Sequence, residues 1–285
     1  MSTILKGAPV ASAINEKTKE ITAILSEQGI KPTLAIIRVG ERPDDLSYEN
    51  GAKKRCEKQG VGVRVFALPA EVTQDELLEV VSSCNQDDTI HGILLFRPLP
   101  KTIQETLICE ALSPAKDVDG VTSASLASVF MNGTVGFPPC TAQACIELLD
   151  FYDINVTGMK TVVLGRSLVV GKPLAMLLVT RNATVTICHT KTKELEQVCH
   201  EAKLLCAAAG QKRLIGEASV GEGSIVLDVG IHVEEDGQLC GDVNFEQVVD
   251  KVSAITPVPG GVGAVTTSLL AYHVALAARK SLQVD

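Results

Sequence analysis

The chain has 285 residues, a length that fits two domains of ordinary size. Its hydrophobic content of 46%, against 21% charged residues, is that of a globular protein and excludes a disordered chain. The net charge of −8 and the aromatic content of only 3% argue against nucleic acid or an anionic membrane surface as the main partner.

The nine cysteines contain no C-x-x-C pair, and several lie within apolar runs. This usage is typical of reduced core residues and predicts a cytoplasmic protein. Cys188 and His189 are adjacent, but no second ligand pair stands at a zinc-like spacing, so we predict no metal site. We expect no signal peptide and no membrane span, because prolines and glycines interrupt the uncharged stretch 252–278.

Strands and helices alternate along the first half of the chain. The apolar periodicity predicts helices over 9–28, 45–59, 73–87 and 103–112, and strands over 33–39, 61–68 and 90–96. A βαβαβ order of this kind indicates a parallel sheet. The turn-rich stretch 113–139 then separates this half from a helix that we expect Thr141 to cap.

The alternation resumes in the second half, with a hairpin turn predicted at 234–237 and a closing helix at 265–280. The strands expected there cover 161–164, 184–188, 204–208, 225–229 and 254–256. The predicted fold class is therefore α/β, with two α/β domains of which the second is a Rossmann-type doubly wound sheet.

The stretch 161–173, T-V-V-L-G-R-S-L-V-V-G-K-P, predicts a dinucleotide site. A buried strand runs into a turn at Gly165 and then into a helix, whose free N–H groups attract phosphate. Ser167 offers a hydroxyl, and Gly171 lets the backbone approach closely. The spacing differs from the G-x-G-x-x-G fingerprint, so a plain strand-to-helix turn is the alternative.

Four segments together resemble the methylenetetrahydrofolate dehydrogenase/cyclohydrolase family. They are the helix of Tyr48, P-A-K-D-V-D-G at 114–120, G-R-S at 165–167 with V-G at 170–171, and T-P-V-P-G-G-V-G at 256–263. The resemblance implies a folate-binding catalytic domain (1–139 with 265–285), an NADP-binding Rossmann domain (140–264) and a cleft between them. It also implies oxidation of methylenetetrahydrofolate, hydrolysis of the methenyl product, and a homodimer.

The same resemblance assigns the folate side to Tyr48, Asp119, Pro257, Gly260 and Gly261. Tyr48 and Asp119 are the candidate catalytic residues, and Asp119 can accept two parallel hydrogen bonds from a pterin ring. The glycines would let the backbone form a wall against the folate. The alternatives are a turn-capping aspartate, an exposed helix tyrosine and a plain linker.

On the cofactor side the resemblance implies six contacts: Gly165, Arg166, Ser167, Gly171, Thr190 and Ile231. Arg166 is suited to neutralise a 2′-phosphate. The strand at 184–188 is followed by His189 instead of the acidic residue that holds a free ribose hydroxyl, which favours NADP over NAD. A solvated loop charge is the alternative for Arg166.

The sequence departs from the family at two linked positions. The family's lysine, one helical turn after the tyrosine, is Ala52 here, and the glutamine that holds that lysine is Phe96. Hydride transfer needs alignment, whereas adding water to the methenyl carbon needs proton removal. We therefore predict a dehydrogenase with weak or absent cyclohydrolase activity, unless Lys53 or Arg97 substitutes. The rival interpretations are a catalytically silent folate and dinucleotide binder, or another Rossmann oxidoreductase.

Overall fold

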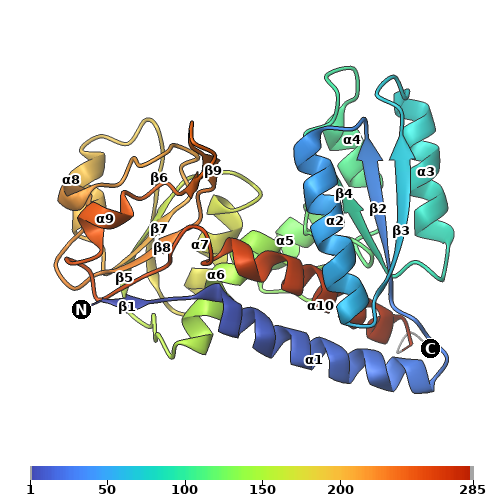
Figure 1. Ribbon diagram of the computed structural model, residues 1–285, viewed down its shortest axis with the longest axis horizontal. Helices are drawn as coiled ribbons and strands as arrows, with labels where there is room; N and C mark the ends of the chain where they lie inside the picture. The colour runs from blue at the N-terminus through green and yellow to red at the C-terminus, as the bar shows by residue number, and fades with distance from the viewer. Residues whose placement is uncertain (1, 283–285) are drawn as a thin grey trace. The chain divides into compact units, whose positions relative to one another are not determined.

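The computed structural model describes residues 2–282, which divide into two compact units (Figure 1). Unit 1 comprises the chain up to Ser12 together with Thr141–Thr266, and unit 2 comprises Ala13–Cys140 with the chain from Thr267 onward. The first residues differ from the expected domain limits. Strand β1 (Thr3–Ile4) pairs in parallel with β11 (Ala254–Ile255), so the start of the chain belongs to the sheet of unit 1.

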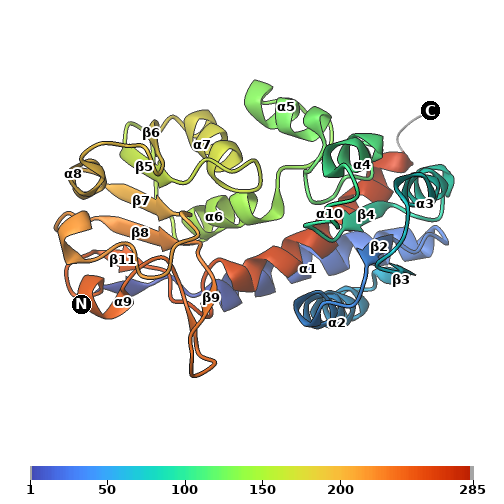
Figure 2. The ribbon, with the colours of Figure 1, turned by 90° about the horizontal axis from the view of Figure 1, so that it is seen from above.

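Unit 1 is built on a six-stranded sheet with the order β1-β11-β8-β7-β5-β6, in which every pair is parallel (Figure 2). Its other strands are β5 (Lys160–Leu164), β6 (Thr184–Cys188), β7 (Leu204–Ala207) and β8 (Ile225–Asp228). Its helices are α6 (Cys140–Phe151), α7 (Gly171–Thr180), α8 (Leu195–His200), η1 (Glu217–Ser219) and α9 (Phe245–Val248). The chain leaves β5 for β6 and then crosses back to β7, which confirms the predicted Rossmann-type winding.

A short antiparallel hairpin follows β8. Its strands are β9 (His232–Val233) and β10 (Leu239–Cys240), and it extends away from the sheet of unit 1 (Figure 2). Gly237 occupies the turn at φ +83°, a conformation that favours glycine. The hairpin turn predicted at 234–237 is therefore confirmed.

Unit 2 contains a three-stranded parallel sheet with the order β3-β2-β4. The strands are β2 (Thr33–Val39), β3 (Gly62–Leu68) and β4 (Gly92–Leu95), and the helices are α2 (Pro43–Lys58), α3 (Gln74–Gln86), α4 (Glu105–Ala111) and α5 (Ser123–Met131). Every residue of the central strand β2 is buried, which explains its nearly continuous apolar sequence.

Helices α1 (Gly7–Glu27) and α10 (Gly263–Ser281) each contribute residues to both units. Within unit 2 they form a small apolar cluster, in which Ile21 and Leu25 of α1 lie with Ala275 and Ala278 of α10. Across residues 2–282, none of the helices has the length and apolar character that crossing a membrane requires.

Two local predictions were wrong. Helix α5, which was not predicted, lies inside the stretch expected to be rich in turns, and it begins after Thr122, whose side chain accepts the N–H of Ser125. Thr141 does not cap the next helix, because α6 already begins at Cys140. The nine cysteines are free and buried, as the sequence predicted for core residues.

Candidate active site

A cavity of about 460 Å³ opens at the carboxyl ends of β5, β6 and β7 in unit 1. Strand order reverses here, since β6 lies on one side of β5 and β7 on the other, and such switch points are where α/β sheets bind ligands. The structure brings four predicted cofactor residues to this cavity: Gly165, Arg166, Ser167 and Thr190.

The loop between β5 and α7 leaves no room for side chains at its glycines. A Cβ on Gly165, which has φ +133°, would lie 2.1 Å from the Ala208 carbonyl oxygen. A Cβ on Gly171 would lie 2.1 Å from the Gly165 oxygen. Ser167 Oγ accepts the N–H of Val170 at 3.1 Å, so its own proton is available to a phosphate oxygen. Gly171 thus shapes the loop and does not line the cavity.

The cavity wall suits an anionic dinucleotide. Among the described residues that line it there is no carboxylate, whereas the guanidinium of Arg166 and the imidazole of His189 are both present. The N–H of Lys191 donates to His189 Nδ1 at 3.1 Å, which holds the loop after β6 in place. Ile231 is not part of this wall and is 65% exposed in the segment before β9.

A buried carboxylate that the sequence analysis did not single out fixes one wall of this cavity. Asp242 is fully buried, and its Oδ2 accepts the N–H groups of Ala209 at 2.6 Å and Gly210 at 3.0 Å. Its Oδ1 lies 2.8 Å from His232 Nε2. Asp228 in turn accepts the N–H of Asp242 at 3.0 Å. These bonds tie β8 and the hairpin to the backbone that lines the cavity.

The two aspartates are packed against glycines. A Cβ on Gly241 would lie 1.9 Å from Asp228 Oδ2, and one on Gly230 would lie 2.4 Å from Asp242 Oδ1. Burial raises the pKa of Asp228 to about 6, although donated backbone N–H groups oppose that rise. The signal in the sequence was an aspartate that ends a buried strand two residues before a glycine, and a second aspartate directly after a glycine.

In unit 2, Tyr48 on α2 contacts Phe96, the residue that follows β4. Their ring centroids are 5.7 Å apart at an interplanar angle of 66°, an edge-to-face pair. Tyr48 is 42% exposed and Phe96 only 6%. Desolvation, followed by the charge of Asp119, raises the pKa of Tyr48 above its ordinary value. The structure therefore brings the two predicted catalytic residues within electrostatic reach of each other.

The two aspartates of the 114–120 motif have different roles. Asp117 is fully buried and is the turn cap, accepting three donors that include the N–H of Thr122 at 2.8 Å. Asp119 takes no part in that cap. Burial raises the pKa of Asp119 to about 6, while the charge of Arg97 and hydrogen bonds from Cys140 act in the opposite direction. Asp119 is therefore the carboxylate of this motif that is left for a ligand.

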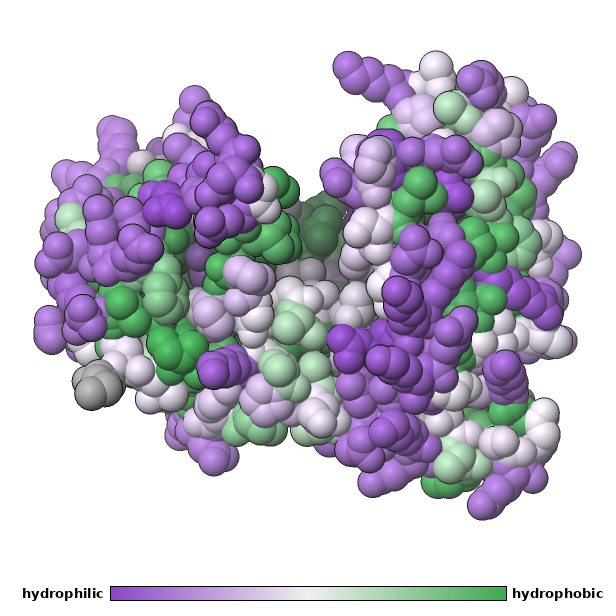
Figure 3. All heavy atoms as spheres, viewed as in Figure 1, coloured by the Kyte–Doolittle hydropathy of each residue, from purple (hydrophilic) through white to green (hydrophobic). Residues whose placement is uncertain are grey.

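The helix turn after Tyr48 carries no free amine beside the ring pair. Ala52 is 1% exposed. Lys53 Nζ lies 2.5 Å from Glu49 Oε1, and Arg38 Nε lies 2.8 Å from the other oxygen of Glu49. Burial raises the pKa of Glu49, but the hydrogen bonds from Lys53 and Arg38 outweigh it and lower the pKa overall. The outer face of α2 is hydrophilic (Figure 3).

The segment 257–261, in unit 1, is packed tightly against the start of α1. Gly260 has φ +100°, and its carbonyl accepts the N–H of Gly7 at 2.8 Å. A Cβ on Gly261 would lie 2.5 Å from the Pro257 oxygen. Gly260 is therefore favoured by its positive φ and Gly261 by backbone packing within the unit, whether or not they also contact folate.

A parallel sheet with a phosphate-suited cavity at its switch point defines a Rossmann-type nucleotide-binding protein. The tetrahydrofolate dehydrogenase/cyclohydrolase NAD(P)-binding domain matches residues 139–282, and the catalytic domain of the same family matches residues 5–119. The chain belongs to the tetrahydrofolate dehydrogenase/cyclohydrolase family, as the sequence motifs implied.

Proteins of this family match nearly the whole length of the chain. Bifunctional protein FolD of Clostridioides difficile is 50% identical over 276 residues, which cover 97% of this chain and 96% of that protein. The bifunctional FolD enzyme of Campylobacter jejuni has a TM-score of 0.96 at 40% identity, covering 99% and 100% of the two chains. Trypanosoma brucei FolD, solved with NADP and an inhibitor, has a TM-score of 0.93 at 31% identity, with 99% of each chain covered.

The Asp242 network yields a testable prediction. In Asp242→Asn a single oxygen replaces two acceptors, so a backbone N–H or His232 loses its partner. We expect a loss of about 1–3 kcal/mol in the free energy of unfolding, measured in urea, together with weaker NADP binding, measured by calorimetry. Asp236→Asn, in the exposed hairpin turn, is the matched control. Unchanged NADP affinity in the destabilised variant would limit Asp242 to a purely structural role.

Proposed function

We propose that this protein is an NADP-dependent methylenetetrahydrofolate dehydrogenase whose methenyltetrahydrofolate cyclohydrolase activity is weak or absent. Unit 2 would be the folate-binding catalytic domain, and unit 1 the NADP-binding domain. The observation that carries the second half of the proposal is the apolar surroundings of Tyr48. A buried methyl group, Ala52, lies one turn further along the helix, and the Phe96 ring packs against the tyrosine.

Oxidation of the methylene carbon requires the protein mainly to orient the folate and the nicotinamide relative to each other. Asp119 would accept two parallel hydrogen bonds from the pterin, and the ring pair of Tyr48 and Phe96 would contact the folate beside the reacting carbon. NADP, when bound, supplies the hydride acceptor. No side-chain base is needed, because the lone pair of the adjacent folate nitrogen drives the loss of hydride.

The cavity of unit 1 supports the choice of NADP. Arg166 would pair with the 2′-phosphate, while Ser167 and Thr190 would offer hydroxyl donors. No carboxylate among the described lining residues competes for that phosphate. Ile231 stays a proposed contact, carried by the family resemblance and by its exposure.

Hydrolysis of the methenyl form requires a group that takes a proton from water. The ammonium of Lys53 is engaged by Glu49. Arg97 lies 3.6 Å from Glu105, and a guanidinium does not lose its proton in proteins. These contacts support the view that neither residue replaces the lysine that the resemblance places at position 52.

We also propose a cytoplasmic homodimer. The family resemblance carries the dimer. The nine free, buried cysteines fit a reducing compartment. Light scattering of the purified chain measures the oligomeric state directly.

Restoring the missing pair should restore hydrolysis. In Ala52→Lys combined with Phe96→Gln, we expect methenyltetrahydrofolate hydrolysis to rise by ~10²- to 10⁴-fold, the usual contribution of a positioned acid or base. Both activities are measured on one preparation, by NADP reduction with methylenetetrahydrofolate and by decay of the methenyl absorbance.

Ala52→Met combined with Phe96→Gln is the control, because it adds length without an amine. Brisk hydrolysis by the unaltered protein, well above the uncatalysed rate, would refute the loss of cyclohydrolase. Absence of NADP reduction despite tight cofactor binding would instead favour a catalytically silent binder. Activity on amino or hydroxy acids without folate would favour another oxidoreductase.

Cofactor choice gives a second expectation. Arg166→Gln removes the charge proposed to meet the 2′-phosphate, so the KM for NADP should rise roughly 10- to 100-fold while the KM for NAD changes little. Arg181→Gln is the control, since Arg181 pairs with Asp150 at the far end of α7. An equal rise in both KM values would show that Arg166 does not read the 2′-phosphate.

The raised pKa of Asp119 predicts a pH dependence for folate binding. Below about pH 6 the carboxylate takes up a proton and loses its capacity to accept two hydrogen bonds, so affinity should fall as the pH drops through that value. Calorimetric titration of folate between pH 5 and 8 measures this. In Asp119→Asn the affinity should be low at every pH, and a profile unchanged by that substitution would contradict the role of Asp119.

A further inference from the structure

A second cavity, of about 640 Å³, lies in unit 2 at the end of the sheet opposite Phe96. Its wall includes Ile90 and His91, which immediately precede β4, whereas Phe96 follows the end of that strand. The volume falls within the range of small-molecule sites. No residue proposed to contact folate or NADP lines it, so the cavity is distinct from the candidate active site.

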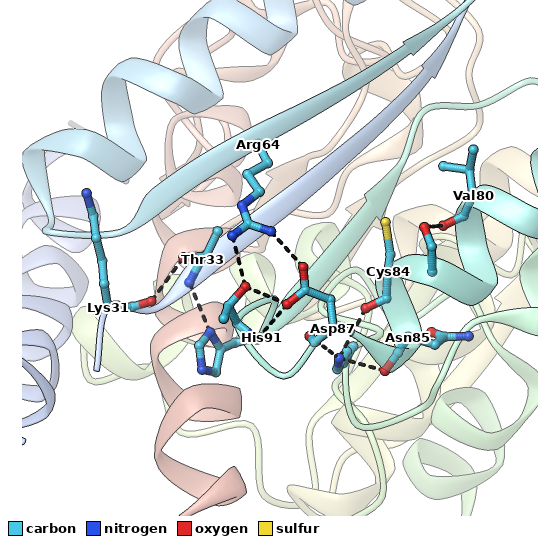
Figure 4. A network of polar contacts seen from close by, with 11 residues as sticks. Lys31, Thr33, Arg64, Val80, Cys84, Asn85, Asp87 and His91 are labelled. Atoms are coloured by element: carbon cyan, nitrogen blue, oxygen red, sulfur yellow. Dashed lines mark hydrogen bonds and ion pairs between the residues drawn. The ribbon is translucent and has the colours of Figure 1, made fainter. Parts of the chain in front are cut away.

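His91 presents a hydrogen-bond donor to this cavity. The residue is 8% exposed, and its Nδ1 accepts the N–H of Thr33 at 3.2 Å (Figure 4). Burial, followed by the charge of Lys116, lowers the pKa of His91, so the ring is neutral near neutral pH. A neutral ring whose Nδ1 accepts must carry its proton on Nε2. Within residues 2–282 no protein acceptor meets that N–H.

Positive charge predominates around this donor. Lys116 Nζ donates to the carbonyl oxygens of Cys84, Asn85 and Asp87, at 3.1, 2.7 and 2.9 Å, and forms no ion pair within the described chain. The carboxylate of Asp87 is already paired with Arg64 at 2.7 Å (Figure 4).

Lys280, which also lines the cavity, carries a second cation with no carboxylate partner among residues 2–282. Its Nζ lies 4.7 Å from the centre of the Phe137 ring. The only acidic side chain lining the cavity within the described residues is Asp88, so two ammonium groups face one carboxylate.

The remaining wall is apolar. Phe137 is 5% exposed and stacks on His273 with ring centroids 4.7 Å apart, so it contributes mainly the edge of its ring. Ile90 and Val135 add aliphatic surface. An occupant that satisfies this wall has an apolar body, and the cations with the His91 N–H require an anionic head.

We propose that this cavity is a binding site for a small organic carboxylate with an apolar body. The carboxylate accepts the His91 Nε2–H and pairs with Lys280, while the body lies along Val135 and the edge of the Phe137 ring. The site is independent of the proposed dehydrogenase activity, and it does not use Tyr48 or Asp119.

The test uses naphthalene carboxylate and its neutral carboxamide, a probe pair that differs in charge and little in shape. Each is titrated into the full chain, and binding is followed by amide proton–nitrogen correlation spectra. We expect saturable carboxylate binding with shifts centred on Val135, Phe137 and Lys280, and carboxamide binding at least about tenfold weaker. Lys280→Gln should weaken carboxylate binding about tenfold, whereas Lys280→Arg should retain it.

Lys280 is exposed near the end of α10, so both substitutions are compatible with folding. Three results would overturn the proposal: equal binding of the two probes, unchanged carboxylate affinity in Lys280→Gln, or shifts confined to the Arg166 or Tyr48 regions. A failure to observe saturable binding at millimolar probe would overturn it as well.

Discussion

Buried carboxylates accept hydrogen bonds from backbone N–H groups, and these bonds hold the segments around both candidate sites. Asp242 fixes the backbone at Ala209 and Gly210 in unit 1, and Asp117 fixes the turn after Val118 in unit 2. A buried carboxylate is costly unless it is fully hydrogen-bonded, so each of these anchors keeps its segment in one conformation. Where such a carboxylate already satisfies a turn, a second carboxylate of the same motif is left for a ligand. Asp119 illustrates this division, because its neighbour Asp117 has already satisfied the turn.

Backbone crowding is the second constraint, and it acts together with the first. The glycines at 165 and 171 bring a loop onto the end of β7, and those at 230 and 241 allow the two buried aspartates to lie side by side. Any side chain at these positions would meet backbone or carboxylate atoms. The loop and the backbone after β7 are therefore held in one arrangement, with the aspartates packed behind them, and hydride transfer requires a cofactor site with a fixed geometry.

The sequence predicted the sheets well because buried parallel strands are nearly continuous apolar runs, as β2 and β7 show. It also brought Gly165, Arg166, Ser167 and Thr190 together correctly. Helix α5 was not predicted because its small residues lack a clear apolar stripe. Strand β1 was not predicted because two residues are too few to show a periodic pattern of apolar residues. The role of Asp242 in the cavity wall could not be foreseen, since its bonds to Ala209 and Gly210 join residues more than 30 positions apart. Whether the assigned residues bind folate and NADP stays a prediction.

The environment of Tyr48 explains why Ala52 and Phe96 are suited to each other. Ala52 and Phe96 are both almost completely buried, so an ammonium placed at position 52 alone would lose its hydration against a benzene ring. A carboxamide at position 96 alone would leave a buried amide without a partner. A lysine at position 52 and a glutamine at position 96 would therefore be tolerable only together. The apolar pair of Ala52 and Phe96 is as self-consistent as that polar pair. Arg97 opposes the rise that burial causes in the pKa of Asp119, and so favours the ionised carboxylate that pterin binding needs.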